Sequence, residues 1–247
     1  MNKRRLIFFI LLPIFIIICV VALTRILLIY RDNLIAEREY ETLRQYAPSV
    51  EVDVEPDNDY YDDEYEQQPE SGELLPNSTQ ELLYINDEYI GWIRITGTNI
   101  DYPMVQAENN FKYLRRTFTG ESSQSGTLFM DFRIRDFDDP FAIIYGHNMD
   151  NGTMFAELER FKDMDFLALN NEIQIFTVND EVLIYTIFHS MVANVEDIVF
   201  TLFGADRQTV TDFLSTIDAP HGAEHLLVLS TCIGDNDDER LLVLAIR

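Results

Sequence analysis

Basic residues are scarce in this sequence. Lys and Arg number 18 against 43 Asp and Glu, which gives the 247 residues a formal net charge of −25 at pH 7. A chain of this charge repels a polyanion such as nucleic acid. The composition therefore excludes a nucleic-acid-binding protein.

Cysteine is scarcer still, with two in the chain, Cys19 and Cys232. Cys19 lies within an apolar run near the N-terminus, so one thiol remains for the folded part and no internal disulfide is available to it. A lone cysteine is ordinarily a small buried hydrophobe. Two of the residues described below favour a chemical role for Cys232 instead.

Charge is absent from residues 6–23, directly after Lys3, Arg4 and Arg5. A helix of that length spans about 27 Å, close to the thickness of a bilayer's hydrocarbon core. A cleaved signal peptide would have a shorter apolar region ending in small residues, whereas here apolar residues 26–30 follow one arginine. We predict an uncleaved transmembrane helix in a single-pass protein of the cell membrane, with a cytoplasmic N-terminus and the rest of the chain extracytoplasmic.

Residues 51–73 contain no Lys or Arg, and 11 of these 23 residues are Asp or Glu. Such a segment repels itself and buries too little apolar surface to fold. Before it, apolar and charged residues alternate from 31 to 46 in a pattern that suits a short helix. The predicted organisation is a cytoplasmic tip and transmembrane anchor at 1–30, an extracytoplasmic helix and acidic flexible linker at 31–73, and a folded domain at 74–247.

Helical periodicity is uncommon within this domain and occurs at residues 154–161 and 208–217. Apolar, β-branched runs recur instead at short spacing between turn residues, which indicates several short strands around one core. No internal repeat is found. The expected fold class is mainly β, an antiparallel sandwich or a closed barrel with a few helices. The predicted strands are residues 89–95, 100–105, 126–131, 141–145, 173–178, 182–192, 226–229 and 241–246.

The last two apolar runs flank a polar and acidic insert, residues 233–239, as expected for two antiparallel strands joined by a surface loop. Cys232 ends the first run and Arg240 opens the second. If the strands pair, a thiol and a guanidinium lie side by side, and a nearby cation favours the reactive thiolate. Arg240 can also hold a substrate carbonyl or stabilise charge on its oxygen, although an arginine that begins a strand is more often a surface charge.

His147 follows the apolar run 141–145 and is flanked by Gly146 and Asn148, so we expect it to project from a strand end into a loop. Catalytic residues are common at such places. By itself it fits a surface or core histidine equally well. Together with Cys232 it predicts a Cys/His pair for acyl transfer, because an imidazole can exchange a proton with the thiol and then with the leaving and attacking groups.

Other candidate sites are weaker. His221 and His225 have the i, i+4 spacing of two metal ligands on a helix, but they offer only two ligands in a predicted loop. The acidic residues 235–239 lack the Gly and the distal Glu of a calcium loop. His189 lies inside an apolar strand and is predicted to be structural. No metal and no other cofactor is expected.

In combination these residues resemble the signature of the sortases, the membrane-anchored cysteine transpeptidases of Gram-positive bacteria. The signature consists of Leu-Ser-Thr-Cys at 229–232, Arg240 eight residues further on, and Tyr-Gly-His-Asn-Met at 145–149. Class B sortases in particular are similar to this chain at residues 91–93, 97–106, 118–121 and 151–155, and in the helical pattern at 208–217.

The resemblance implies an eight-stranded sortase-type β-barrel with its active site at one end, so that 74–247 is the catalytic domain. It implies that Cys232 is a nucleophile that attacks the Thr carbonyl of a C-terminal sorting motif on a secreted protein. His147 is then the acid/base, and Arg240 stabilises the substrate and the oxyanion. The residues expected to bind substrate are Ser230, Thr231 and Asn148. The implied partners are secreted proteins with a sorting signal and an amine acceptor from a peptidoglycan precursor or a pilin.

Several alternatives remain open at this level. Ile233 follows the cysteine where class B sortases commonly have a polar or acidic residue, which leaves the substrate preference open. A cysteine endopeptidase, in which water replaces the amine, forms the same thioester. A pilin-polymerising sortase uses a lysine of another protein subunit as its acceptor. The non-enzymatic alternative is an anchored wall-binding module with an incidental thiol.

Overall fold

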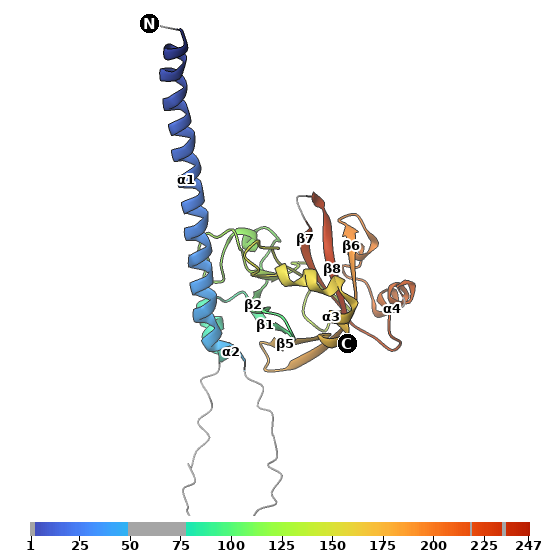
Figure 1. Ribbon diagram of the computed structural model, residues 1–247. Coiled ribbons are helices and arrows are strands. Elements are labelled where there is room, and N and C mark those ends of the chain that lie inside the picture. The colour runs from blue at the N-terminus through green and yellow to red at the C-terminus, as the bar shows by residue number, and fades with distance from the viewer. Residues whose placement is uncertain (1–2, 49–77, 218, 234–235) are drawn as a thin grey trace, which may run out of the picture.

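A computed structural model of the protein describes residues 3–48, 78–217, 219–233 and 236–247. The strands of this described part form one closed barrel in the order β1-β2-β3-β4-β7-β8-β6-β5 (Figure 1). The predicted class, mainly β with an eight-stranded barrel, is confirmed. The strands are β1 (Tyr89–Ile95), β2 (Asp101–Val105), β3 (Leu128–Met130), β4 (Phe141–Tyr145), β5 (Glu172–Thr177), β6 (Val182–Asn194), β7 (Leu226–Ile233) and β8 (Asn236–Ile246).

Two neighbouring pairs in the barrel, β2–β3 and β4–β7, are parallel, and the other pairs are antiparallel. The barrel is therefore mixed rather than purely antiparallel. Parallel neighbours need a long crossover instead of a tight turn. Residues 106–127 and 146–225 supply these two crossovers. Because β4 and β7 run in the same direction, the residues that follow them emerge at the same edge of the barrel.

The core lies inside the barrel and beneath its covering loops. Residues 226–231 of β7 and 241–246 of β8 are all buried, as is typical of strands with both faces covered. Trp92 and Phe155 are also completely buried. Removing one such large apolar side chain costs about 2–5 kcal/mol. This dense packing holds the ends of the central strands, where the chemistry is expected, in fixed positions.

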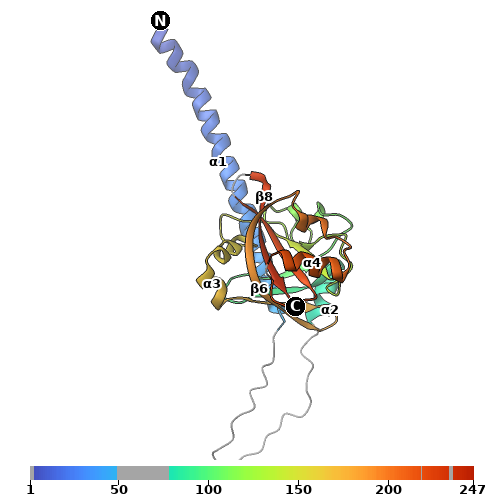
Figure 2. The same ribbon diagram turned by 90° about the vertical axis from the view of Figure 1, so that its right-hand side faces the viewer.

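Helix α1 (Lys3–Leu43) is a continuous helix of 41 residues. It is about 60 Å long at 1.5 Å per residue. All side chains from residue 11 to residue 30 are exposed, and within the described part α1 is the one helix long and apolar enough to cross a membrane. Further along, Ala36, Tyr40 and Leu43 are buried against the barrel, and both views show α1 passing from clear space onto the domain (Figures 1 and 2).

The helix predicted at 31–46 is therefore the continuation of the apolar helix, completed by the 3-10 turn η1 (Arg44–Tyr46). The predicted acidic linker, 51–73, lies outside the described residues. On either side of it, Pro48 accepts a hydrogen bond from Arg94 of β1, and α2 (Ser78–Ile85) packs next to the same strand. The chain thus contacts the barrel both before and after the linker.

The helix predicted at 208–217 is confirmed as α4 (Arg207–Thr216). Asp206 caps its N-terminus by accepting a hydrogen bond from the backbone N–H of Thr209 at 2.8 Å. That contact lowers the pKa of the Asp206 carboxyl below its ordinary value, because the cap bonds favour the charged form.

The helix predicted at 154–161 forms only in part. Met154 has a φ of 56°, which a right-handed helix cannot contain. Regular structure therefore starts at the 3-10 helix η3 (Ala156–Lys162), followed by α3 (Met164–Leu169). Neither α2 nor α3 was predicted, because helices of eight and six residues show too little periodicity. The remaining 3-10 turns are η2 (Lys112–Arg115) and η4 (Ile198–Thr201).

Candidate active site

The thiol and the guanidinium predicted to be neighbours are carried by paired residues. Strands β7 and β8 pair in a register that sets Cys232 opposite Arg240, and both side chains are half-buried. The predicted surface loop is mostly strand, since β8 starts at Asn236 and pairs with β6 through Glu239. The ladder between β6 and β8 thus extends the sheet past the apolar run and holds the start of the arginine-bearing segment.

The parallel pairing of β4 with β7 brings His147 to the same end of the barrel. Tyr145 is paired with Ser230, and the backbone N–H of Gly146 donates to the carbonyl of Ser230 at 3.1 Å. His147 and Cys232 each lie two residues beyond that pair. Residues from distant parts of the sequence therefore leave adjacent parallel strands side by side.

The imidazole of His147 is held by a backbone carbonyl. Its Nε2 lies 2.7 Å from the carbonyl oxygen of Leu114. A carbonyl oxygen only accepts hydrogen bonds, so Nε2 carries a proton in this contact. Nδ1 is then the ring nitrogen that can take up or release a proton during a reaction.

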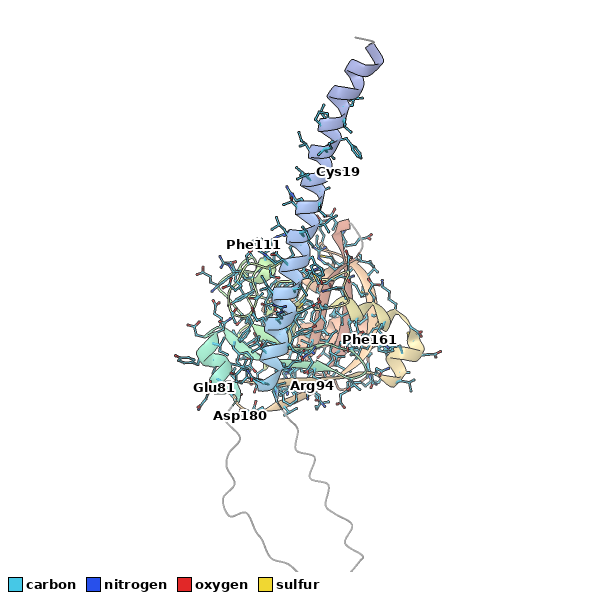
Figure 3. The ribbon with its side chains drawn as sticks, turned by 60° about the vertical axis from the view of Figure 1, so that its left-hand side comes forward. Cys19, Glu81, Arg94, Phe111, Phe161 and Asp180 are labelled. Atoms are coloured by element: carbon cyan, nitrogen blue, oxygen red, sulfur yellow. The ribbon has the colours of Figure 1, made fainter. Side chains whose placement is uncertain are left out.

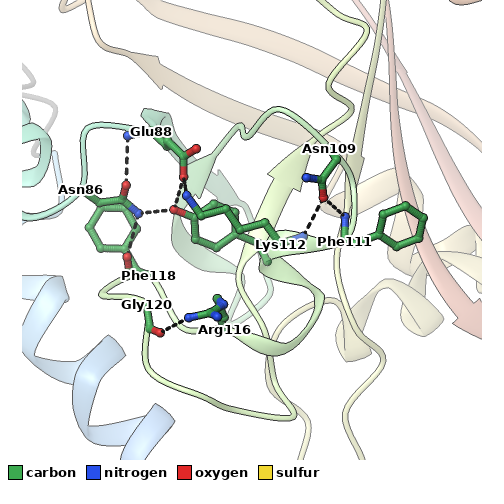
Figure 4. Close-up of polar contacts among 9 residues, drawn as sticks. Asn86, Glu88, Asn109, Phe111, Lys112, Arg116, Phe118 and Gly120 are labelled. Atoms are coloured by element: carbon green, nitrogen blue, oxygen red, sulfur yellow. Dashed lines mark hydrogen bonds and ion pairs between the residues drawn. The ribbon is translucent and has the colours of Figure 1, made fainter.

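The segment that supplies this carbonyl is fastened to the turn before β1 (Figure 4). The side-chain amide of Asn86 donates to the Tyr113 hydroxyl at 2.8 Å and to the Phe118 carbonyl at 2.7 Å. The Tyr113 hydroxyl donates to Glu88, which also binds Lys112. Burial and the bond to Glu88 raise the pKa of Tyr113 above its ordinary value, so that its hydroxyl remains a donor.

The start of the same segment carries an exposed aromatic ring. Asn109 accepts hydrogen bonds from the backbone N–H groups of Phe111 and Lys112, which fixes the first turn of η2 (Figure 4). The side chain of Phe111 is 80% exposed. It nevertheless lines the pocket described next, so it forms part of the rim.

Cys232, His147 and Arg240 line one pocket of about 350 Å³. This volume is in the range of small-ligand sites. Ser230 and Thr231, predicted to bind substrate, are also part of its wall. Their hydroxyl groups are buried and have no hydrogen-bond partner among the described protein residues. The rest of the wall consists of Asn110, Phe111, Leu114, Thr127, Phe129, Tyr145, Gly146, Val195 and Phe200.

The third predicted substrate residue, Asn148, is not part of this wall. Its side-chain amide donates to the backbone carbonyl of Cys232 at 3.2 Å and to Glu159 at 3.3 Å. It thus links the loop after β4 to the end of β7. In this position Asn148 holds the backbone of Cys232, and contact with a substrate stays a prediction.

A buried carboxylate supports one side of the pocket. Asp131 is completely buried and accepts hydrogen bonds from Arg133, Asn110 and Tyr145, the last two of which line the pocket. Burial alone would raise the pKa of Asp131, but the bonds from Arg133 and Asn110 outweigh it and lower the pKa below its ordinary value. The carboxylate therefore stays charged and holds two side chains of the wall.

Sequence reasoning missed most of this wall. Asn110, Phe111, Leu114, Val195 and Phe200 come from connections with no recognisable pattern, and Phe129 and Tyr145 lie in predicted strands that do not by themselves indicate a site. Gly146 is an exception, since it belongs to the motif around His147. A Cβ at Gly146 would lie 2.4 Å from Leu128 and 2.6 Å from the Phe155 ring. Only a glycine fits between these two side chains, and its neighbour His147 depends on that fit.

The other histidines do not join this site. His189 lies on β6, as expected, but its side chain is exposed and stacks on Phe188, so its structural role stays a prediction. His221 lies in a turn, and His225 places its Nδ1 3.2 Å from the Asp139 carbonyl in a segment without helix. The helical spacing of two metal ligands therefore does not form there.

A closed barrel that brings a cysteine, a histidine and an arginine together at one pocket defines the class of cysteine-dependent acyltransferases. The sortase domain family model matches residues 93–247. The chain belongs to the sortase family, and it is most like class B. Sortases are cysteine transpeptidases, so the non-enzymatic alternative is excluded.

Individual relatives agree with this assignment. Sortase B of Listeria monocytogenes is 31% identical over 173 residues, covering 65% of this chain and 69% of the relative. The crystal structure of Clostridium perfringens sortase B is 30% identical with a TM-score of 0.61, covering 68% of this chain and 97% of the other. A class B sortase of Streptococcus pyogenes involved in pilus biogenesis is 30% identical with a TM-score of 0.58, covering 68% of this chain and 97% of the other.

Proposed function

We propose that this sortase cleaves a C-terminal sorting motif of secreted proteins after a threonine and joins the new carboxyl end to a cell-wall amine. The observation that carries the proposal is the meeting of Cys232, His147 and Arg240 at one pocket. In this proposal Cys232 is the nucleophile, His147 the acid/base, and Arg240 the cation that holds the substrate carbonyl.

The first half of the proposed reaction forms a thioester. The sulfur of Cys232 attacks the threonine carbonyl while His147 holds the proton of the thiol at Nδ1, the nitrogen not engaged by Leu114. Arg240 stabilises the charge that develops on the carbonyl oxygen. The C–N bond then breaks, and His147 gives its proton to the departing amine.

The second half resolves the thioester with an amine. The acceptor nitrogen attacks the same carbonyl, loses a proton to His147, and forms an amide as the C–S bond breaks. The thiolate of Cys232 is regenerated. The unpaired hydroxyls of Ser230 and Thr231 support a substrate backbone in the pocket, because a hydrogen bond to a ligand would satisfy them.

The proposed location is the cell membrane, with α1 as a single span. Lys3, Arg4 and Arg5 keep the N-terminus cytoplasmic, and the barrel then lies on the extracytoplasmic side. The exposed apolar side chains of residues 11–30 support this arrangement. In it, both the secreted substrate and the cell-wall acceptor are on the side of the catalytic domain.

The test uses the full chain in detergent micelles, a set of peptides with the pattern Pro-x-Thr, and an amine acceptor. Mass spectrometry of the products reads the cleavage site and the ligated peptide. Cys232→Ala is expected to remove all product. Cys19→Ala changes the only other thiol, which is exposed on α1, and is expected to react like the wild type.

Four outcomes decide between the alternatives. Ligated product in the wild type alone supports transpeptidation, and hydrolysed peptide with no ligated product in the presence of the amine indicates an endopeptidase. Product formed by Cys232→Ala would contradict the proposed nucleophile. Absence of any product from the wild type with every peptide would contradict the substrate class.

Pilin polymerisation is a second candidate, because one similar structure is a class B sortase involved in pilus biogenesis. The acceptor separates the two functions. Anchoring predicts faster resolution by a peptidoglycan-type peptide amine, and polymerisation predicts faster resolution by a lysine on a folded protein subunit. Competition between the two acceptors in one reaction measures this preference directly.

A further inference from the structure

The extracytoplasmic end of α1 is built into the domain rather than merely linked to it. Ala36, Tyr40 and Leu43 follow the i, i+4, i+7 spacing of one helix face, and all three are buried. Figure 3, which brings α1 forward, shows this part lying across the barrel while Cys19 stands clear of it.

One path leads from Tyr40 to the ring of His147. The Tyr40 hydroxyl donates to the Gly126 carbonyl at 2.6 Å and lies 3.2 Å from the hydroxyl of Thr127. Gly126 has a left-handed φ of 60° and packs so closely that a Cβ there would lie 2.8 Å from the carbonyl oxygen of Leu114. That oxygen binds His147 Nε2 at 2.7 Å. Tyr40 thus supports the peptide segment that orients the imidazole.

A second path leads from Tyr40 to the backbone of His147. The Tyr40 ring meets the Tyr102 ring edge to face, with centroids 5.3 Å apart. The Tyr102 hydroxyl accepts a hydrogen bond from the backbone N–H of Met154 at 3.3 Å, in the residue with the left-handed φ of 56°. The next N–H, of Phe155, donates to the His147 carbonyl at 2.9 Å.

The loop between His147 and Met154 has one more contact with the helix. The side-chain amide of Asn151, in that loop, donates to Glu37 of α1 at 3.2 Å. Burial raises the pKa of Tyr40 above its ordinary value, so its hydroxyl keeps the proton that it donates. The side chains of Glu37 and Tyr40, on one turn of α1, therefore fasten both segments that hold the histidine.

We propose that the docked end of α1, residues 36–43, positions His147 for proton transfer, with Tyr40 as its central residue. The proposal rests on the acid/base role of His147 in the proposed function. Tyr40 is a positioning residue, since it reaches the imidazole only through Leu114 and the Met154–Phe155 backbone. The helix that continues into the apolar span is then a working part of the active site.

The first experiment compares Tyr40→Phe with Tyr30→Phe in the full chain. Both remove one hydroxyl from α1, but Tyr30 is exposed and precedes the docked part. Tyr40→Phe is expected to lower kcat for thioester formation about tenfold with little change in KM, because a misplaced catalytic group slows chemistry more than binding. Tyr30→Phe is expected to match the wild type.

A second readout does not depend on any sorting peptide. In a Cys19→Ala background only Cys232 can react with iodoacetamide, and the pH profile of that reaction reports its coupling to His147. His147→Ala defines the uncoupled profile. The alkylation profile of Tyr40→Phe is expected to shift toward that of His147→Ala, whereas the profile of Tyr30→Phe is expected to match that of the wild type.

An unchanged kcat and an unchanged alkylation profile in Tyr40→Phe would overturn the proposal, even with a lowered Tm, because they would leave only a structural role. If Tyr40→Phe does not fold, Glu37→Ala carries the test against the exposed control Glu41→Ala, with a smaller effect expected in the same direction. If the wild type forms no product with any peptide, the proposed function fails, and the alkylation profiles still decide this proposal.

Discussion

Polar side chains on two sides of the barrel differ in whether they have hydrogen-bond partners. On the β1–β2 side, the Trp92 indole and the Arg94 guanidinium both donate to Asp101, at 2.7 and 3.0 Å. On the β7 side, Ser230 and Thr231 are buried and their hydroxyls have no hydrogen-bond partner among the described residues. An unpaired buried polar group costs about 1–3 kcal/mol. The first side is therefore arranged for stability, and the second accepts a cost that a ligand can relieve.

The same change in an arginine on each side gives the largest expected difference. Arg240→Lys is expected to slow thioester formation by about 10²–10³-fold, because a lysine cannot reproduce the planar donor pair beside a developing oxyanion. Arg94→Lys removes part of a half-exposed ion pair and is expected to leave the rate unchanged, at a cost in stability of no more than about 1 kcal/mol. Single-turnover kinetics and denaturant unfolding measure the two effects, and equal rates for both variants would contradict the comparison.

Two carboxylates, Asp131 beside the pocket and Asp101 on the β1–β2 side, should contribute differently to stability because Asp131 is buried and Asp101 is partly exposed. Asp131→Asn is expected to destabilise the fold by about 3 kcal/mol, since it leaves the donors around a buried side chain without their charged acceptor. Asp101→Asn, at a partly exposed position, is expected to cost about 1 kcal/mol. Denaturant unfolding gives both values, and a larger loss at Asp101 would show that burial does not determine the difference between the two carboxylates.

The lowered pKa of Asp131 also predicts a pH dependence. Its folded pKa is below the unfolded value of about 3.9, so the unfolded chain binds the proton more readily. The stabilisation is complete above the unfolded pKa and is lost as the pH falls through the folded pKa. Asp131→Asn should therefore reduce the loss of unfolding free energy as the pH falls below about 4. An unchanged loss at low pH would show that other carboxyl groups cause it.

Alanine substitutions at two glycines with left-handed φ values should show how much of the stability cost comes from backbone strain and how much from packing. Gly126→Ala is expected to cost about 2 kcal/mol or more, because its Cβ would meet the carbonyl oxygens of Tyr113 and Leu114 as well as a strained φ. Gly120 has a φ of 90° with open space around it, and Gly120→Ala is expected to cost about 1 kcal/mol. Only Gly126→Ala should also lower kcat, because Leu114 holds His147.

The smallest effect concerns single hydroxyls. Thr98 both donates to the Ile95 carbonyl and accepts from the Ile100 N–H, so Thr98→Val is expected to destabilise by about 1 kcal/mol. Thr231→Val removes an unpaired hydroxyl and is expected to leave stability unchanged or slightly raised, while KM for the peptide rises. A stability loss at Thr231 as large as at Thr98 would show that its hydroxyl is satisfied in the folded protein.

Local patterns were sufficient to predict some elements and insufficient for others. Strands β1 and β4 form with the bounds expected from their apolar runs. Strand β3 is shorter than the predicted 126–131, because Gly126 turns into the left-handed region and Asp131 bonds to Arg133. The β6–β8 ladder lengthens the C-terminal hairpin through residues whose own composition favours a loop.

The residues of the site also differ in whether a local sequence pattern predicts them. Cys232 and Arg240 could be paired from the sequence because they flank one hairpin, and His147 because it ends a clear strand. Leu114 and Phe111 could not be assigned to the site from the sequence. They belong to a 3-10 turn in a long crossover, which has no periodic signal, and the position of that turn depends on tertiary contacts such as the hydrogen bond from Asn86. Likewise the parallel pairing of β4 with β7 joins segments some eighty residues apart, which no local pattern records.

The direct joining of α1 to the barrel also sets an orientation. The end of β7 and the start of β8 lie at the end of the domain that faces the N-terminal half of α1, while α2 and the C-terminus lie at the opposite end (Figures 1 and 2). Phe111 lies toward the same end (Figure 3). Tyr30, at the end of the exposed run 11–30, is six residues from the buried Ala36, or about 9 Å along a helix.

With α1 as the proposed span, this geometry makes the helix a rigid spacer that turns the pocket toward the bilayer surface at a short, fixed height. Substrates then approach in the narrow layer beside the lipid headgroups rather than from open wall. An insertion between Tyr30 and Ala36 would raise that height by about 1.5 Å per residue and rotate the barrel by a quarter turn or more, unless it adds close to whole turns. The length of α1 therefore determines both the distance of the active site from the bilayer and the direction in which it faces.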